Sequence, residues 1–422
     1  MSKTFDILQE QKELFLNNGS FCILPFIHLY STPDGELRPC CISPGFEETR
    51  VDLKDKSLYD AFNSPQMKAL RTDMIHGRKH SVCRSCYDRE DATGHSPRIN
   101  YNNSVGTIYE MPLLKEDYEV DLDFQYIDIR FSNLCNFKCR MCSHEFSSNW
   151  YEDSTKIRPN YKPKGKIIKI SDTIADDLKP YLSKLKNIYF AGGEPLIMPE
   201  HFEILKYLHD NIDVDETYDT IPISIHYNTN LSVIKYDQHS LINIWKKFYK
   251  VLLSISCDGI GDVGEYQRTG FKTKIFENNL NTLKKHFVPT NIFHATKGLF
   301  YSFQYTTTIM NVYHLFDFID YMLEKNHITN SDQIDFYYAW APSEYSLSQL
   351  PLNEKEKVTS FIKNKMNNYS EKTKSELEKI IEFTNSNIEP INHTRGFTKD
   401  YISQMDLLHG GSFEEISKIE LK

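Results

Sequence analysis

The sequence has no long apolar run and no excess of positive charge, and each absence excludes a class of protein. No stretch approaches the roughly 18 apolar residues of a membrane span, and the first residues lack the apolar core of a signal peptide. We therefore expect a cytoplasmic protein with no membrane partner. The 49 Lys and Arg against 58 Asp and Glu leave a net charge of −9, so nucleic acid, which selects basic surfaces, is not an expected partner.

Disorder is excluded as well, because 40% of the residues are hydrophobic and 13% aromatic. A chain of 422 residues exceeds the roughly 250–300 that one core holds, so two or three structural units are expected. All but the last of its 9 cysteines fall in roughly the first third of the chain. Since a reducing compartment disfavours structural disulfides, clustered cysteines indicate metal ligands or catalysts.

Short β-type runs alternate with helical patterns from about Gln125 onward, which is typical of βαβ units and a parallel sheet. The expected strands are Tyr126–Phe131, Ile188–Ala191, Ile223–Tyr227, Val251–Ser256, Phe300–Tyr305 and Ile334–Tyr338. Between them, spacings such as Phe276, Leu280 and Leu283 place apolar side chains on one helical face. The fold class predicted for residues 120–350 is α/β.

The flanking segments have a different pattern. Residues 20–110 are rich in Cys, Pro and Gly and predict a small metal-stapled domain, preceded by a helical lead at 1–19. Charged helical patterns over Asn353–Met366 and Glu371–Phe383 predict a helical C-terminal extension at 351–422. Cys257 follows Ser256 at the end of an expected strand, so its side chain should point to the opposite side of the sheet. It is predicted to be a buried apolar residue.

Three cysteines follow the first expected strand in the segment YIDIRFSNLCNFKCRMCSH: Cys135, Cys139 and Cys142. A loop at this point lies at the carboxyl edge of a parallel sheet, where α/β enzymes build active sites. Three thiolates can hold a four-iron cluster and leave its fourth iron open. Zinc is the alternative, but structural zinc takes four ligands, and His144 is the one further donor evident beside the triplet.

This Cys-x3-Cys-x2-Cys loop resembles the defining motif of the radical S-adenosylmethionine (SAM) superfamily. The resemblance implies a partial (β/α)6 barrel of the TIM type and a 4Fe–4S cluster on Cys135, Cys139 and Cys142, whose open iron is chelated by SAM. It also implies reductive cleavage of SAM to a 5′-deoxyadenosyl radical that abstracts a substrate hydrogen. A reductant such as flavodoxin or ferredoxin is then an expected partner.

Later segments resemble the same family over about residues 120–350. Gly192, Gly193 and Glu194 form a Gly-Gly-Glu-Pro segment that would hold the SAM amino group, since glycine allows close backbone approach and a carboxylate accepts from an ammonium. The other SAM contacts implied by the resemblance are Thr229, Asn230, Ser256 and Arg268, the last for the SAM carboxylate. A turn or helix cap is the alternative role at each strand end. Met141 stands where the family often has an aromatic residue near the adenine.

A second set of cysteines lies at the front of the chain. The order Cys-x12-Gly-x4-Cys and then Cys-x2-Cys resembles the Twitch form of the SPASM auxiliary domain and implies a second 4Fe–4S cluster on Cys22, Cys40, Cys83 and Cys86. In many family members that domain follows the barrel, whereas here it precedes it. A zinc staple is the alternative for these four thiols, and the adjacent Cys41 could replace Cys40 as a ligand.

Together the motifs predict a radical SAM enzyme with an auxiliary cluster that accepts an electron, passes electrons inward or shapes the pocket. Related Twitch and SPASM proteins often modify peptides or proteins, so the resemblance favours a peptide or protein substrate. Two alternatives stay open: a radical SAM enzyme acting on a sugar, nucleoside or amino acid, and a non-catalytic, zinc-stapled binding module. No side chain is assigned as a catalytic acid or base.

Overall fold

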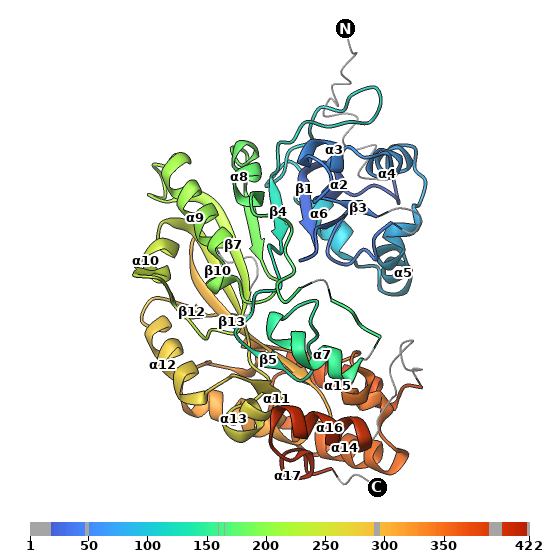
Figure 1. The fold of residues 1–422 in the computed structure, drawn as a ribbon, viewed down its shortest axis with the longest axis vertical. Helices are drawn as coiled ribbons and strands as arrows, with labels where there is room; N and C mark the ends of the chain where they lie inside the picture. Colours follow the sequence, from blue (N-terminus) through green and yellow to red (C-terminus); the bar gives the residue numbers. More distant parts are fainter. Residues whose placement is uncertain are drawn as a thin grey trace. The chain divides into compact units, whose positions relative to one another are not determined.

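The computed structural model describes residues 18–46, 50–158, 160–163, 165–290, 296–387 and 399–419 (Figure 1). The chain divides into two compact units. The first unit comprises residues 1–133, 167–226 and 247–249, and the second comprises 134–166, 227–246 and 250–422. Most of the predicted helical lead, residues 1–17, lies outside the described residues.

All six predicted strands of the α/β region are present. They are β4 (Tyr126–Ile129), β6 (Asn187–Phe190), β7 (Ile221–Thr229), β10 (Phe248–Ser256), β13 (Gly298–Thr307) and β14 (Ile334–Tyr338). In β10, residues 251–255 are buried without interruption, as expected for a parallel strand that is covered on both faces. The predicted α/β class with a mostly parallel sheet is confirmed.

In the first unit, the Cys-rich segment extends the sheet that β4 and β6 form. Strand β1 (His28–Ser31) pairs in parallel with β4, so that His28 lies opposite Tyr126 and Tyr30 opposite Asp128. Two antiparallel strands, β2 (Glu36–Arg38) and β3 (Val51–Asp52), continue the sheet outward, and Figure 1 shows β1 directly beside β4. The Cys-rich segment therefore shares a sheet with the first strands of the α/β region.

Short helices hold the Cys-rich segment together: α2 (Leu24–Ile27), α3 (Leu58–Phe62), α4 (Pro65–Ile75), α5 (Arg84–Thr93) and α6 (Pro97–Asn103). Ser57, Ser64 and Ser96 cap α3, α4 and α6 by accepting backbone amide hydrogen bonds. Arg71 on α4 is fully buried and donates to the carbonyl of Pro25 at 2.9 Å, which ties α4 to α2. Two further helices of this unit are α8 (Ile174–Leu178) and α9 (Pro199–Asn211).

The second unit is built on β13, which pairs in parallel with β10 on one edge and with β12 (Val288–Pro289) and β14 on the other. Short antiparallel pairs join β5 (Lys138–Cys139) to β11 (Arg268–Thr269) and β8 (Lys235–Tyr236) to β9 (His239–Ser240). The helices are α7 (Tyr151–Ile157), α10 (Leu241–Trp245), α11 (Gly261–Gln267), α12 (Thr273–Leu283), α13 (Leu315–Glu324), α14 (Leu352–Lys365), α15 (Glu371–Asn385), α16 (Lys399–His409) and α17 (Phe413–Ser417).

The helical predictions for this unit are confirmed where the structure describes them. Phe276, Leu280 and Leu283 are the buried residues of α12, and α14 and α15 match the two helices expected after residue 351. Cys257 is fully buried, as predicted. Residues 388–398 of the C-terminal extension lie outside the described residues.

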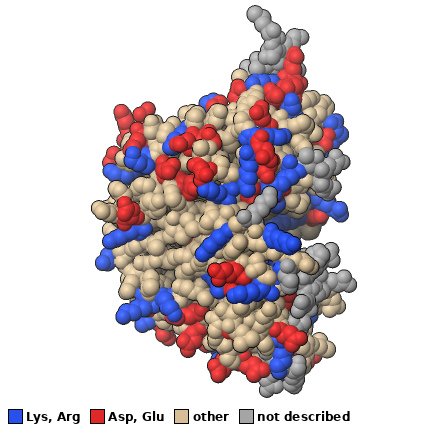
Figure 2. Space-filling model, in the orientation of Figure 1, with Lys and Arg blue, Asp and Glu red and all other residues tan. Residues whose placement is uncertain are grey.

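The surface agrees with the charge balance of the sequence. On the face that Figure 2 displays, Lys and Arg are interspersed with Asp and Glu, and neither sign covers the face alone. Within the described ranges, no helix combines the length and the apolar character that crossing a bilayer would require.

Candidate metal centres

The loop of three cysteines belongs to the second unit, and Cys135, Cys139 and Cys142 are each partly exposed. The backbone amide of Phe137 donates to the Cys135 sulfur at 3.4 Å, and the amide of Cys142 donates to the Cys139 carbonyl at 2.9 Å. Burial, followed by the charges of Cys139 and Cys135, raises the pKa of Cys142. The loop thus brings three thiols together, and a bound metal would supply the positive charge that ionises them.

A buried ion pair lies against this loop. Strand β11 pairs with β5 so that Arg268 is opposite Cys139, and its guanidinium lies 3.9 Å from the Cys139 sulfur. The Arg268 Nε donates to Oδ2 of the fully buried Asp258 at 2.6 Å, and Asp258 Oδ1 accepts the Thr306 amide at 2.8 Å. Burial raises the pKa of Cys139, and the Arg268 charge opposes that shift. Contact between Arg268 and a SAM carboxylate stays a prediction.

Three of the predicted SAM contacts are polar residues at or just after the ends of strands, and their surroundings differ. Asn230 donates to the side chain of Asn136 in the cysteine loop at 3.1 Å, so the structure brings this predicted SAM contact against the loop. Thr229 is buried, and its hydroxyl accepts the backbone amide of Leu231 at 3.0 Å, a turn-forming role. Ser256 is the last residue of β10. None of these observations tests the predicted contacts with SAM.

The Gly-Gly-Glu segment lies in the first unit, after β6. Gly192 has φ +116°, and a Cβ at this position would lie 3.0 Å from the Ser132 carbonyl, so the backbone here requires glycine. The Gly193 amide donates to the same carbonyl at 3.3 Å. Glu194 is buried, and its Oε1 accepts the Leu196 amide at 3.1 Å at the start of the short 3-10 helix η4 (Pro195–Ile197). Its predicted contact with SAM stays a prediction.

His144 does not have a nitrogen available to complete a zinc site at the three cysteines. It is buried, its Nδ1 lies 2.9 Å from the Tyr161 hydroxyl, and its Nε2 lies 2.9 Å from the Lys166 carbonyl. In the part of the chain that the structure describes, no three His, Cys, Asp or Glu side chains converge on the position of a single metal ion.

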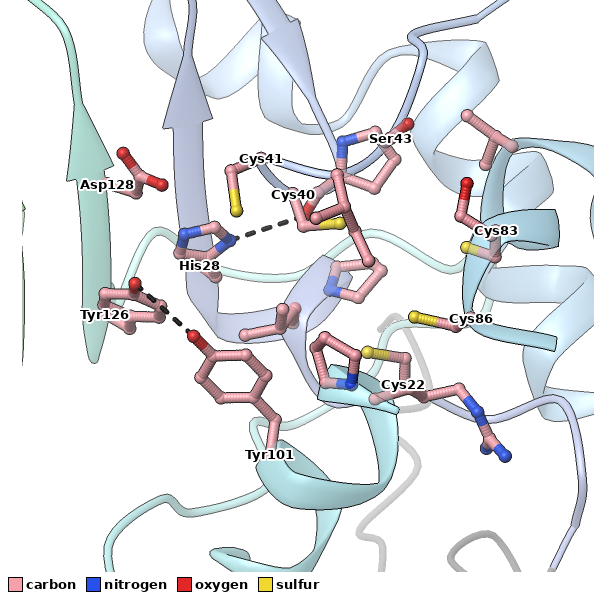
Figure 3. A pocket seen from close by; sticks show the side chains of 18 residues that line it. Cys22, His28, Cys40, Cys41, Ser43, Cys83, Cys86, Tyr101, Tyr126 and Asp128 are labelled. Carbon is pink, nitrogen blue, oxygen red and sulfur yellow. Dashed lines mark hydrogen bonds between the residues drawn. The ribbon is translucent and has the colours of Figure 1, made fainter. Parts of the chain in front are cut away.

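The other set of cysteines lines one cavity of about 190 Å³ in the first unit (Figure 3): Cys22, Cys40, Cys83 and Cys86. Cys22 precedes α2, Cys40 follows β2, Cys83 ends the 3-10 helix η1 (Ser81–Cys83), and Cys86 lies in the first turn of α5. Gly35, the glycine of the motif, has φ +87° in the turn between β1 and β2. The conformation of that turn explains the glycine, because a positive φ disfavours other residues.

The cavity is suited to a group larger than one ion. Its volume of about 190 Å³ is several times the roughly 30 Å³ of a water molecule. Burial raises the pKa of Cys22 and of Cys83, and it raises the pKa of Cys40 to about 12. A metal group bound in this cavity would supply the positive charge that ionises these thiols.

The structure distinguishes Cys40 from Cys41. Figure 3 shows the sulfur of Cys40 on the side of Cys83 and Cys86, and the sulfur of Cys41 on the side of His28 and Asp128. Burial and then the Asp128 charge raise the pKa of Cys41. This geometry favours Cys40 as the fourth ligand.

Two further polar residues line the same cavity, and neither was assigned from the sequence. His28 is buried, its Nδ1 lies 3.3 Å from the Pro39 carbonyl, and burial lowers its pKa to about 3. Burial raises the pKa of Asp128 to about 7, although Arg130 lies 3.6 Å away. A charged residue inside an apolar strand is a recognisable signal for Asp128, whereas nothing in the local sequence distinguishes His28 from a core residue.

The described residues thus combine an α/β fold with parallel strands, a loop that carries three thiols and a cavity lined by four thiols. The comparison with protein families agrees. The model of the radical SAM superfamily matches residues 129–299, and that of the SPASM iron–sulfur cluster-binding domain matches residues 22–87. The chain therefore carries a radical SAM domain with a SPASM iron–sulfur domain ahead of it. This family implies a 4Fe–4S cluster and SAM, and it disagrees with a non-catalytic zinc module.

The similarity to solved structures is distant. Native anSMEcpe with bound AdoMet is 17% identical over 57% of this chain and 59% of that chain, with a TM-score of 0.38. Native anSMEcpe with bound AdoMet and Kp18Cys peptide is 20% identical over 57% and 59%, with a TM-score of 0.36. Streptococcus suis SuiB bound to S-adenosylmethionine is 14% identical over 70% and 63%, with a TM-score of 0.32. The chain thus covers less than two thirds of each, and no curated protein matches it.

Proposed function

We propose that this enzyme abstracts a hydrogen atom from a peptide or protein substrate, using SAM at a cluster on Cys135, Cys139 and Cys142. We further propose that a second 4Fe–4S cluster, on Cys22, Cys40, Cys83 and Cys86, accepts an electron from the substrate. The observation that carries this proposal is the division of the thiols into an open set of three and a cavity-lining set of four. Four protein ligands close a metal group, whereas three leave a position for SAM.

When bound, the cluster and SAM supply a one-electron cleavage of the S–C5′ bond, which yields methionine and a 5′-deoxyadenosyl radical that takes a hydrogen atom from the substrate. The electron comes from a reductant such as flavodoxin or ferredoxin. The products of that step are 5′-deoxyadenosine and a substrate radical. If the four-thiol site holds a cluster, that cluster would accept one further electron and solvent would accept one proton, which would leave an oxidised product.

The residues around the cysteine loop support this role by setting its charge and shape. Arg268 places a positive charge beside Cys139, and Asp258 holds that charge in position. A cation beside a thiolate favours the ionised ligand. Asn230 bonds to Asn136 within the loop, so the end of β7 and the loop hold a common geometry.

The SPASM match over residues 22–87 supports a peptide or protein as substrate, through the family's reactions. The test is anaerobic incubation of the protein with SAM, reductant and peptides encoded beside its gene, with free sugars, nucleosides and amino acids as a parallel panel. We expect 5′-deoxyadenosine to form and one peptide to lose two hydrogens by mass spectrometry. If a free metabolite stimulates 5′-deoxyadenosine formation and no peptide does, the substrate is a small molecule and not a peptide.

A further inference from the structure

The side chain of Arg140 lies on the cysteine loop between Cys139 and Cys142, yet it has no exposure to solvent. Its Nε donates to the carbonyl of Tyr266 at 2.9 Å, and its guanidinium carbon lies 3.7 Å from the centre of the Tyr266 ring. Its counter-ion is Asp406, whose Oδ1 lies 3.1 Å from Nη1. A cationic residue within the metal-binding loop is therefore neutralised by the last part of the chain.

The end of α16 fits closely on the same tyrosine. Asp406 also accepts the Tyr266 hydroxyl at 2.6 Å, and the carbonyl of Gly410 accepts from Arg140 Nη2. Gly411 has φ +89°, and a Cβ on it would lie 2.7 Å from the Tyr266 ring. In Figure 1, α16 accordingly lies by α11, which contains Tyr266. No side chain larger than that of glycine fits at this contact without displacing the ring.

A second contact joins α16 to the loop. His409 is the last residue of α16, and its side chain is fully buried. Its Nε2 lies 3.4 Å from Asp153 Oδ2, and the same oxygen pairs with Lys138 in the loop. The His409 ring lies 5.0 Å from that of Trp150, whose indole N–H donates to the Cys139 carbonyl at 2.8 Å.

We propose that α16, Gly410 and Gly411 form a C-terminal clamp that positions the cysteine loop, with Asp406 and His409 as its positioning residues. The proposal rests on the proposed function, because it takes Cys135, Cys139 and Cys142 as the ligands of the SAM cluster. Strand β5 of the loop has only two residues, so its own backbone pairing is short. A buried Arg needs its partner, since removing one member of a buried pair leaves an uncompensated charge.

The test uses the full-length, anaerobically reconstituted protein and the variant Asp406→Asn, with Asp400→Asn as the matched control. Asp400 is an exposed acidic residue on the same helix. The readouts are the midpoint potential of the SAM cluster, the change that SAM causes in its electron paramagnetic resonance (EPR) spectrum, and the melting temperature. We expect Asp406→Asn to shift the potential positive, because the unpaired Arg140 charge favours the reduced cluster, and to weaken the response to SAM. Asp400→Asn should match the wild type.

A double variant, Arg140→Met with Asp406→Leu, separates positioning from stability. Replacing a buried pair by apolar residues of similar size is often neutral for stability, so the melting temperature should recover. The response to SAM should stay weak, because the carbonyls of Tyr266 and Gly410 have lost their donor. Full recovery of that response, or an unchanged potential in Asp406→Asn, would overturn the clamp. A wild type without any response to SAM would overturn the proposed function, and the clamp with it.

Discussion

The two cysteine sites differ in the number of thiols and in their surroundings. The front cavity collects four thiols from residues 22–86, out of turns and helix starts, and its lining includes Leu24, Pro25 and Val82. The loop holds three thiols within residues 135–142, beside the buried pair of Arg268 and Asp258. The closed set suits a cluster that stores or passes electrons, whereas the open set suits one that binds an exchangeable ligand beside fixed charges.

The largest expected effect comes from Cys135→Ala/Cys139→Ala/Cys142→Ala. This variant should lose all 5′-deoxyadenosine formation and about four irons, while the front cavity keeps about four. Iron and sulfide analysis measures the cluster content, and chromatography of the SAM products measures 5′-deoxyadenosine formation. Loss of all iron would show that the front cavity does not hold its cluster independently and would break the comparison.

Cys40→Ala and Cys41→Ala sharpen the comparison at the front cavity. We expect Cys40→Ala to lose the second cluster, about four irons, because its sulfur lies on the side of Cys83 and Cys86. Cys41→Ala should keep both clusters and serves as the matched control. The iron content of the two reconstituted variants shows which cysteine is the fourth ligand. Loss of iron in Cys41→Ala and not in Cys40→Ala would make Cys41 the ligand.

Asp258→Asn tests the charge beside the open loop. Because Arg268 is then buried without its partner, the free energy of unfolding should fall by about 3–5 kcal/mol in anaerobic urea titrations. The control is Asp123→Asn, which removes a surface pair with Lys184 whose side chains are 40% and 56% exposed. That change should cost about 0–1 kcal/mol. If both variants lose the same free energy of unfolding, the buried pair of Arg268 and Asp258 does not stabilise the fold more than a surface pair does.

The raised pKa of Asp128, which lines the front cavity, predicts that the free energy of unfolding depends on pH. An acid whose folded pKa is raised from 3.8 to about 7 stabilises the fold when protonated, and this contribution is lost as pH rises from 3.8 to about 7. Between pH 5.5 and 7, the free energy of unfolding should therefore fall by about 1.4 kcal/mol per pH unit more in the wild type than in Asp128→Asn. Urea titrations across that range measure the difference. Parallel profiles for the two proteins would contradict the raised pKa.

Cys257→Ser should have the smallest effect. This thiol is fully buried and donates to the Gly259 carbonyl at 3.3 Å, a bond that a serine hydroxyl can also make. Both sets of iron should be retained in the reconstituted variant. A drop in iron content would mean that an eighth cysteine takes part in cluster binding, contrary to the division into three and four.

The periodicity of apolar residues predicted where helices and strands lie, but it did not predict which strands pair with each other. The apolar run of β10 and the one-sided helix α12 follow from residue periodicity, and both are confirmed. The pairing of β1 with β4 joins residues about a hundred positions apart, and no local pattern encodes it. The domain boundaries at 20–110, 120–350 and 351–422 stay predictions, as do the residue contacts with SAM.

The sites show the same limit. The cysteine spacings predicted which thiols to group, but Cys40 and Cys41 are neighbours in a turn, and their orientations depend on the surrounding sheet. The pairing of Arg140 with Asp406 was not predictable, because its members lie far apart in sequence and Asp406 stands in no recognisable motif. Three-dimensional packing, and not residue type, determines both features.

The measurement that most directly tests the division into two sites is EPR spectroscopy of the reduced, anaerobic protein, with and without SAM, combined with metal analysis. The wild type should contain about eight irons and give a cluster signal that changes when SAM is added. The variant lacking Cys135, Cys139 and Cys142 should give a signal from the front cavity that SAM does not alter. Zinc in place of iron, or a wild-type signal indifferent to SAM, would contradict the radical mechanism.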